Sequence, residues 1–294
     1  MRKPTGEKVF DAVNVFIMLI LITVFAYPFL NLLAISLNDA KDAASGGIYL
    51  FPREFSLDNY KAVFNNDQLL NGFIISVSRT VIGTVVSVLA TSMLAYGLSK
   101  QELMGRKAYN IICMVTMFFS GGLIPYAVWI NTLGLTDSFL VYIIPSMINV
   151  WNMIIMRTYF KSFPKEIEEA AKMDGCSNFG IFFRFVIPLS MPVIATVTLF
   201  NAVGQWNSWF DAYIFINKQE LVPLQTILMK IISQNSATIE MSKLMGNKLT
   251  SVMSVTPESI KIATIMVATI PIISIYPFVQ KYFVQGILIG SVKE

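Results

Sequence analysis

Six stretches of this chain are long and apolar enough to cross a lipid bilayer, and they constrain its fold more than any other feature. A helix that spans the hydrocarbon core needs roughly 20 mostly apolar residues. The composition agrees, since 55% of the residues are hydrophobic, only 14% are charged, and the mean hydropathy is +0.62. The expected spans are residues 13–37, 72–98, 108–130, 139–157, 186–211 and 260–283. We therefore predict an all-α integral membrane protein with six transmembrane helices, forming a single domain over residues 1–294.

The lysines and arginines orient these spans. Basic residues concentrate in cytoplasmic loops, and an even number of spans places both termini on one side. The more basic side carries Arg2, Lys3, Lys8, Lys100, Arg106, Lys107, Arg157, Lys161, Lys165, Lys172, Arg184, Lys281 and Lys293. The other side carries Lys41, Arg53, Lys61, Lys218, Lys230, Lys243, Lys248 and Lys261, spread over longer loops. We predict a multi-pass protein of the cell membrane with both termini in the cytoplasm.

This topology leaves two extracellular loops, residues 38–71 and 212–259, and a cytoplasmic loop at residues 158–185. The first extracellular loop is expected to be an ordered elbow of short helical pieces around Pro52, Asp58 and Asn59. The second is long enough to be functional, and residues 224–232 within it have helical periodicity. The first span is too long for the apolar core of a cleavable signal peptide, so we expect it to be a signal anchor.

Several classes of chemistry lack their residues. The chain has no histidine, which excludes histidine-based triads and most zinc sites. Its two cysteines, Cys113 and Cys176, fall in different compartments, so a disulfide framework is not expected. No phosphate-binding GxxxxGK[ST] loop occurs, and no stretch is basic enough to indicate nucleic-acid binding. We therefore expect no catalytic residue, no metal site and no cofactor on this chain.

The cytoplasmic loop contains a polar two-helix element that does not resemble a membrane span. Helix signals begin at Ser162 and Pro164, and Gly175 occupies the position after a helix end that favours positive φ. Ser177 can cap a second helix, whose apolar residues recur at helical spacing until Pro188 and Pro192 disturb the backbone. A bare Glu-Ala-Ala triplet would fit an ordinary amphipathic loop; the added Asp-Gly and proline spacing favours a docking surface. We call residues 158–185 the docking loop.

The sequence EAAKMDGCSNFGIFFRFVIP resembles the EAA loop of ABC-importer permeases, which docks in a cleft of a separate ATPase subunit. The matching positions are Glu169, Ala170, Ala171, Asp174, Gly175 and Pro188. Phe185 and Ile187 stand where the family usually has Ile and Leu, and both exchanges keep an apolar residue. The resemblance implies that residues 169–171, 174 and 175 couple this chain to an ATPase, which would bind the ATP and Mg²⁺.

Other segments extend the resemblance over most of the chain. These segments look like carbohydrate-uptake permeases of the MalG type and, among those, the LplC/YtcP-like group. They are the elbow with Pro52, the residues Ala95-Tyr96-Gly97 at the end of the second span, the stretch FSGGLIP and the C-terminal QKYFVQGILIGSVKE. This resemblance implies a type I importer (MetI-like) fold and four partners: a second homologous permease, an ATPase homodimer or heterodimer, an extracellular solute-binding lipoprotein and an oligosaccharide. It also implies a Gram-positive bacterium.

Polar and aromatic residues near the ends of the fourth and fifth spans suggest a substrate path. Intramembrane polar groups usually face the interior of a helix bundle, and sugars need both hydrogen-bonding amides and aromatic faces. The candidates are Asn149, Asn152, Asn201, Gln205, Trp206, Asn207 and Asp211. The tryptophan could equally belong to an interfacial aromatic belt, with the amides joining helices. Arg79, within a span, is expected to snorkel or to pair with a neighbouring carboxylate.

Two other function classes compete with an importer subunit. A secondary, ion-coupled transporter would place coupling carboxylates within its spans, whereas Asp11, Asp137 and Asp211 lie near span ends. An intramembrane enzyme would need a nucleophile with a base, and neither GxSxG nor HExxH occurs. The sequence therefore favours the ATP-driven importer.

Overall fold

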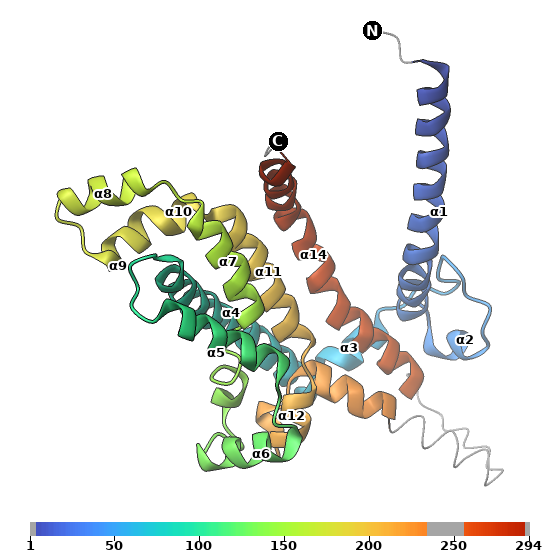
Figure 1. The fold of residues 1–294 in the computed structure, drawn as a ribbon. Helices are drawn as coiled ribbons and strands as arrows, with labels where there is room; N and C mark the ends of the chain where they lie inside the picture. Colours follow the sequence, from blue (N-terminus) through green and yellow to red (C-terminus); the bar gives the residue numbers. More distant parts are fainter. Residues whose placement is uncertain (1–3, 234–255, 292–294) are drawn as a thin grey trace. The chain divides into compact units, whose positions relative to one another are not determined.

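The computed structural model describes residues 4–233 and 256–291, and the regular structure of these ranges is helical, as predicted. A lone antiparallel bridge joins Asn38 and Phe55. The chain divides into two compact units, Met1–Leu70 with Lys230–Ile270 and Asn71–Met229 with Pro271–Glu294. Figure 1 shows the helices of both units.

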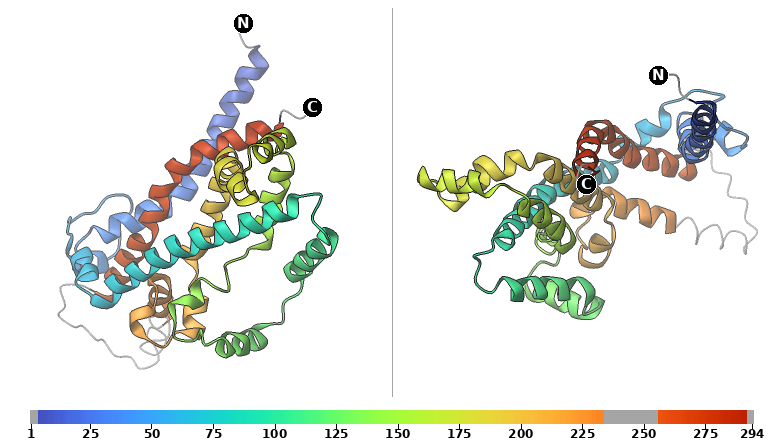
Figure 2. Two further views of the ribbon diagram at one scale, coloured as in Figure 1. Left: turned by 90° about the vertical axis from the view of Figure 1, so that its left-hand side faces the viewer. Right: turned by 45° about the horizontal axis from the view of Figure 1, so that its top comes forward.

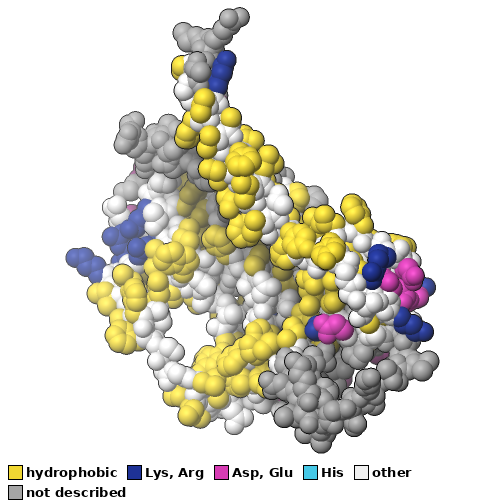
Figure 3. Space-filling model, turned by 90° about the vertical axis from the view of Figure 1, so that its right-hand side faces the viewer, with side chains coloured by type: hydrophobic (Ala, Val, Ile, Leu, Met, Phe, Trp, Pro, Cys, Tyr) yellow, Lys and Arg dark blue, Asp and Glu magenta, His cyan; other side chains and the backbone are white. Residues whose placement is uncertain are grey.

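The first unit contains a long apolar helix and a compact elbow. Helix α1 (Thr5–Ser36) exposes large hydrophobic side chains along most of its length, and Figure 3 shows them covering it. This surface suits lipid or a partner rather than water. The elbow holds the short helices α2 (Ala40–Ala44) and α3 (Asp58–Phe64). It is ordered as predicted, but Asn59 is no cap: it is buried and donates to the carbonyls of Ser36 and Asn38.

The second unit is built around α4, a helix that begins at Asp67, ends at Ser99 and contains no proline. Figure 2 shows it in cyan to teal as one uninterrupted helix. The elements that follow are α5 (Arg106–Phe118), α6 (Leu123–Thr132), η1 (Phe139–Tyr142), α7 (Val150–Lys161), α8 (Lys165–Met173), α9 (Asn178–Ile181), η2 (Phe182–Val186), α10 (Ile187–Leu189), α11 (Met191–Asn207), α12 (Phe210–Phe215) and η3 (Gln219–Leu221). Helix α14 (Pro257–Ser291) enters this unit at Pro271, and a helix over Leu224–Ser233 confirms the one expected at residues 224–232.

Three helices of the described ranges are continuous and apolar enough to cross a membrane, namely Gly6–Ser36, Asp67–Ser99 and Glu258–Ile275. They coincide with the first, second and sixth expected spans. Two further candidates are bent pairs: α5 with α6 at 117°, and Asn178–Leu189 with α11 at 85°. A total of six spans therefore stays a prediction.

The bend between α5 and α6 interrupts the third expected span, residues 108–130. Phe119 leaves the helix in an extended conformation, and Gly122 has a φ of 84°. A non-glycine residue adopts this left-handed region only at a cost. The glycine pair Gly121-Gly122 thus redirects the chain where hydropathy alone predicts a continuous helix.

The prediction of a single helix over the fourth expected span, residues 139–157, is wrong. The chain forms the short helix η1, then turns, and α7 begins only at Val150. Pro145 disfavours a helical conformation in the residue before it. Asn149 is extended, and its side-chain oxygen accepts a hydrogen bond from the Asn152 amide at 3.0 Å. This N-cap starts a new helix inside an apolar stretch.

The fifth expected span, residues 186–211, is helical mainly over α11. Ser190 separates α10 from α11, and a proline lies in the first turn of each helix. This confirms that Pro188 and Pro192 disturb the backbone there. The loop predicted to be the second extracellular one, residues 212–259, lies outside the described residues over 234–255.

Candidate functional site

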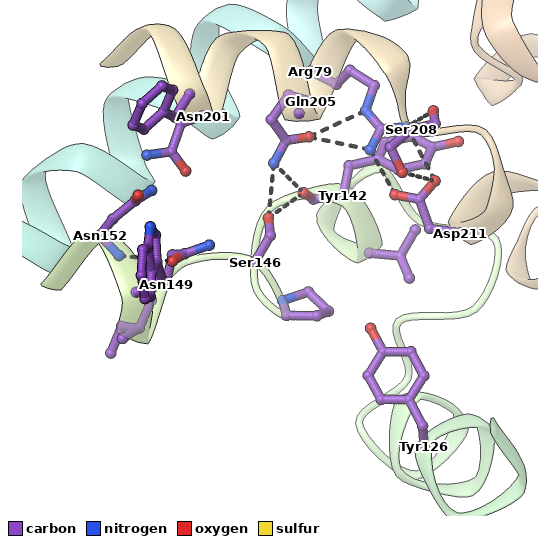
Figure 4. A pocket seen from close by; sticks show the side chains of 16 residues that line it. Arg79, Tyr126, Tyr142, Ser146, Asn149, Asn152, Asn201, Gln205, Ser208 and Asp211 are labelled. Atoms are coloured by element: carbon purple, nitrogen blue, oxygen red, sulfur yellow. Dashed lines mark hydrogen bonds and ion pairs between the residues drawn. The ribbon is translucent and has the colours of Figure 1, made fainter. Parts of the chain in front are cut away.

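A cavity of about 710 Å³ lies in the second unit, between α4, α7, α11 and the turn after η1. Its lining includes Arg79, Tyr126, Tyr142, Ser146, Asn149, Trp151, Asn152, Asn201, Gln205, Ser208 and Asp211. Figure 4 shows the three asparagines at one end and the Arg79–Asp211 pair at the other. Five of the seven side chains predicted for a substrate path, from three separate elements, thus meet around one cavity.

Arg79 is held by an internal network. Its Nη2 lies 2.6 Å from Oδ2 of Asp211, and its Nη1 donates to Oδ1 of Asp211 and to the Ser208 carbonyl. Its Nε and Nη2 donate to Oε1 of Gln205, and its guanidinium carbon lies 4.2 Å from the Tyr142 ring centroid. All five N–H groups of the guanidinium therefore have acceptors, which confirms the predicted pairing with a carboxylate.

Gln205 joins this network to the other wall of the cavity. Its Nε2 donates to the Tyr142 carbonyl at 3.1 Å and to the Ser146 hydroxyl at 2.8 Å. A Cβ atom added at Gly83 would lie 2.9 Å from Cδ and Nε2 of Gln205. Glycine at this position of α4 therefore makes room for the amide.

The asparagine end is less fully bonded. Asn201 donates to the Val197 carbonyl and accepts from Ser87, so its amide helps to join α11 to α4. The Asn149 oxygen caps α7. The side chain of Asn152 makes no hydrogen bond within the described ranges, although the residue is only 4% exposed. The Trp151 side chain is largely exposed beside it. The amide can form hydrogen bonds with a ligand's hydroxyl groups, and the tryptophan ring can pack against a ligand's apolar ring face.

Two predicted path residues lie elsewhere. Trp206 is buried against Phe73, with ring centroids 6.0 Å apart, and lines a separate apolar pocket of about 190 Å³ with Pro271. Asn207 is exposed and does not line the cavity. The helical phase of α11 explains both positions, since Asn201, Gln205 and Ser208 share one face while Trp206 is rotated from it.

Other lining residues were not predicted from the sequence. Tyr142 ends η1 and Ser146 lies in the turn before α7, so no helical periodicity relates them to Asn149. Tyr126 reaches the cavity from α6, a separate element whose position follows from the bend at Gly122. No local signal indicates it.

Asp137 fastens the loops beyond this cavity. It has a φ of 54°, and its carboxylate accepts hydrogen bonds from the backbone N–H groups of Asn217 at 2.5 Å and Lys218 at 3.1 Å. These bonds favour the charged carboxylate and lower the pKa of Asp137 below its usual value. The chain segments before η1 and after α12 are thus joined by an ionised group.

The first helix of the docking loop, α8, ends just before Gly175, as predicted. Gly175 has a φ of 77°, its N–H donates to the Lys172 carbonyl, and the Cys176 N–H donates to the Ala171 carbonyl. This pair of bonds defines a Schellman motif. Ser177 then caps α9 by accepting from the Gly180 N–H at 3.2 Å, which confirms the predicted start of the second helix.

The predicted coupling residues differ in exposure. Glu169, Ala170, Asp174 and Gly175 are exposed, as a docking surface requires. Ala171 is only 4% exposed and belongs to the buried core cluster of its own chain. Its small side chain therefore seats α8 on the rest of the unit, and no partner can reach it in this conformation.

Comparison with known proteins identifies the family. The model of the binding-protein-dependent transport system inner membrane component matches residues 7–289. This chain belongs to that family. The permease is 40% identical over 98% of its length to the polygalacturonan/rhamnogalacturonan transport system permease protein YtcP of Bacillus subtilis, covering 99% of that protein. It is also 40% identical to protein LplC of the same organism, covering 100% of this chain and 98% of that one.

A solved structure is similar over nearly the whole permease. One chain of a bacterial ABC transporter involved in the import of the acidic polysaccharide alginate is 30% identical, with a TM-score of 0.85, over 96% of this chain and 99% of that one. A chain of the alginate transporter in complex with a pentasaccharide-bound periplasmic protein is 14% identical, with a TM-score of 0.51, and shares the fold. The MetI-like permease fold implied by the resemblance to carbohydrate-uptake permeases is thus confirmed.

Proposed function

We propose that this permease is the membrane-spanning subunit of an ATP-driven oligosaccharide importer and forms half of a translocation path with a second, homologous permease. The observation that carries the proposal is that one unit of the chain holds both an exposed docking helix and a cavity lined by amides and aromatic rings. Two relatives named for polysaccharide transport support the substrate class.

The cavity has the chemistry of a saccharide path. Its volume of about 710 Å³ falls within the range of about 300–1,000 Å³ typical of small-molecule sites. Asn149 and Asn152 offer hydrogen-bonding amides, and Trp151 and Tyr126 offer aromatic faces. A half-path of this kind exposes polar groups that lipid cannot satisfy. We therefore infer that a second permease covers it.

The docking loop would bind a separate ATPase subunit, which would hold ATP and Mg²⁺. Glu169 and Ala170 of α8 and Asp174 directly after it are exposed, and the Schellman motif fixes the direction of the chain at Gly175. On the outer side, the loop over residues 212–259 would meet an extracellular solute-binding lipoprotein. Both termini would then lie in the cytoplasm.

The test is docking of the ATPase to the purified permease pair. Ala170→Glu places a charge on the exposed face of α8, and Gly175→Val forces a side chain into positive φ at about 1 kcal/mol or more. Both variants should insert normally but lose most of the copurifying ATPase. Gly105→Val is the matched control, since Gly105 has a φ of 75° outside the docking loop. Normal docking in both test variants would contradict the proposed coupling.

A further inference from the structure

An ion pair joins the docking loop to the end of α4. Lys100 directly follows the last residue of α4, and its Nζ forms an ion pair with the Glu168 carboxylate of α8. The side chains are 29% and 14% exposed, so water screens the pair only partly. The Lys100 ammonium also lies 4.1 Å from the ring centroid of Tyr96, one turn earlier on α4. We call this arrangement the Lys100–Glu168 clamp.

Apolar packing at the same junction fixes the docking loop to α4. Ala171, one turn after Glu168, is buried in one cluster with Ala95 and Tyr96 of α4 and with Phe182. The rings of Tyr96 and Phe182 lie 5.3 Å apart. Close-packed contacts of this kind transmit displacement rather than absorb it. A movement of α8 would therefore displace the end of α4.

The covalent route from the docking loop to the cavity is less regular. It passes through the π-helical segment η2 and then through the 85° bend before α11. Such breaks in the helical hydrogen-bond ladder are the places where helices kink. Helix α4 has no comparable break between Lys100 and Arg79. At 1.5 Å per residue these positions are roughly 30 Å apart.

At its other end α4 is tied firmly to the cavity. Arg79 donates to Asp211, Gln205 and the Ser208 carbonyl, which belong to α11 and α12 or to the turn between them. Ser87 adds a hydrogen bond to Asn201. A shift of α4 would therefore move the polar lining of the cavity together with it.

We propose that the Lys100–Glu168 clamp makes α4 the lever that carries movement of the docking loop to the cavity. Lys100 and Glu168 are positioning residues in this scheme: neither touches substrate or nucleotide, and both act by keeping α8 in register with α4. The inference rests on the proposed function, since it requires an ATPase at the docking loop.

The experiment uses the complete transporter, reconstituted in proteoliposomes with its ATPase and second permease. Cys113 and Cys176 are replaced by serine, and Trp151→Cys places a single reporter thiol in the cavity. The rate of labelling by a water-soluble maleimide is measured before and after trapping with Mg-ATP and vanadate. Trapping should change this rate when the clamp is intact.

Lys100→Glu or Glu168→Lys alone should reduce the trapping-dependent change about fivefold or more, although the ATPase still copurifies. The exchanged pair, Lys100→Glu with Glu168→Lys, should restore the change, a rescue that a merely local packing role would not give. If Lys100→Glu or Glu168→Lys does not assemble, Glu168→Gln is tested in its place. The matched control exchanges Asp58 and Lys61, an ion pair with side chains 57% and 70% exposed, and should have no effect.

Two results would overturn the clamp: an undiminished change in the single variants, or no restoration in the exchanged pair while the ATPase remains bound. If the ATPase fails to copurify even with the unaltered permease pair, the proposed function itself fails. Docking and labelling are separate measurements, so the two failures are distinguishable.

Discussion

Replacing Asp211 by alanine should destabilise the permease through Arg79. The Arg79 side chain is 2% exposed, and Asp211 accepts two of its five N–H bonds, one of them at 2.6 Å. Removing one partner of a buried ion pair costs about 3–5 kcal/mol, because the remaining charge is left buried. Asp211 is 23% exposed toward the cavity, so solvent can replace part of the lost interaction. We therefore expect a loss of about 3 kcal/mol.

A loss of this size should lower the thermal unfolding midpoint by roughly 5 °C for a chain of this length. The assay is tryptophan fluorescence of the purified permease pair on heating. The double variant Arg79→Met with Asp211→Leu replaces the pair by apolar residues and should be more stable than Asp211→Ala alone. Asp58→Ala, in the exposed pair with Lys61, is the control and should leave the midpoint unchanged. If Asp211→Ala leaves the midpoint unchanged, or the double variant is the less stable, the network does not hold the cavity as argued.

Three further outcomes follow from the geometry. Gly83→Ala should disturb the glutamine amide at the cavity and reduce uptake, whereas Gly97→Ala, with open space at its Cβ, should only gain about 1 kcal/mol of helix propensity. Because the pKa of Asp137 is lowered in the fold, its contribution to stability is present above about pH 4 and lost as the pH falls through the folded pKa. Below pH 4, the unfolding midpoint of Asp137→Asn should therefore fall less steeply with pH than that of the unaltered permease. Asn152→Ala should weaken saccharide uptake by about 2- to 12-fold, the equivalent of one hydrogen bond, measured with a labelled oligosaccharide that the transporter takes up. Asn201→Ala should instead chiefly lower the unfolding midpoint. The reverse pattern would contradict the assignment of free groups in the cavity.

The sequence predicts the helical class and the docking loop well, because both depend on local signals. Gly175 and Ser177 determine their backbone geometry within a few residues, so the Schellman motif and the cap could be identified in advance. Hydropathy, by contrast, measures only the preference for an apolar environment. It does not detect the redirection at Gly122 or the new helix start at Asn149, where hydrogen-bonding and steric rules act inside apolar stretches.

The cavity could be predicted only in part, for a similar reason. Five of the seven residues grouped near the ends of two spans do line one cavity, but the direction of each side chain depends on the rotation of its helix. Trp206 follows Gln205 directly and yet lines a different pocket, since neighbouring residues on a helix point about 100° apart. Tyr126 reaches the cavity through tertiary packing that no sequence pattern records.

The polar groups of the cavity divide into two sets with different roles. Those on or facing α4 form bonds within the chain: Arg79 uses all its donors, and Asn201 accepts from Ser87. A ligand could bind the Arg79 guanidinium only by breaking an existing hydrogen bond, which leaves a buried polar group unsatisfied at a cost of about 1–3 kcal/mol, and the Asn201 amide is already partly used in joining α11 to α4. At the start of α7, the Asn152 amide makes no side-chain hydrogen bond in the described part of the chain, and Trp151 beside it is exposed. If the proposed saccharide path is correct, we therefore expect the first turn of α7 to bind the passing saccharide, while α4 keeps the opposite wall in place.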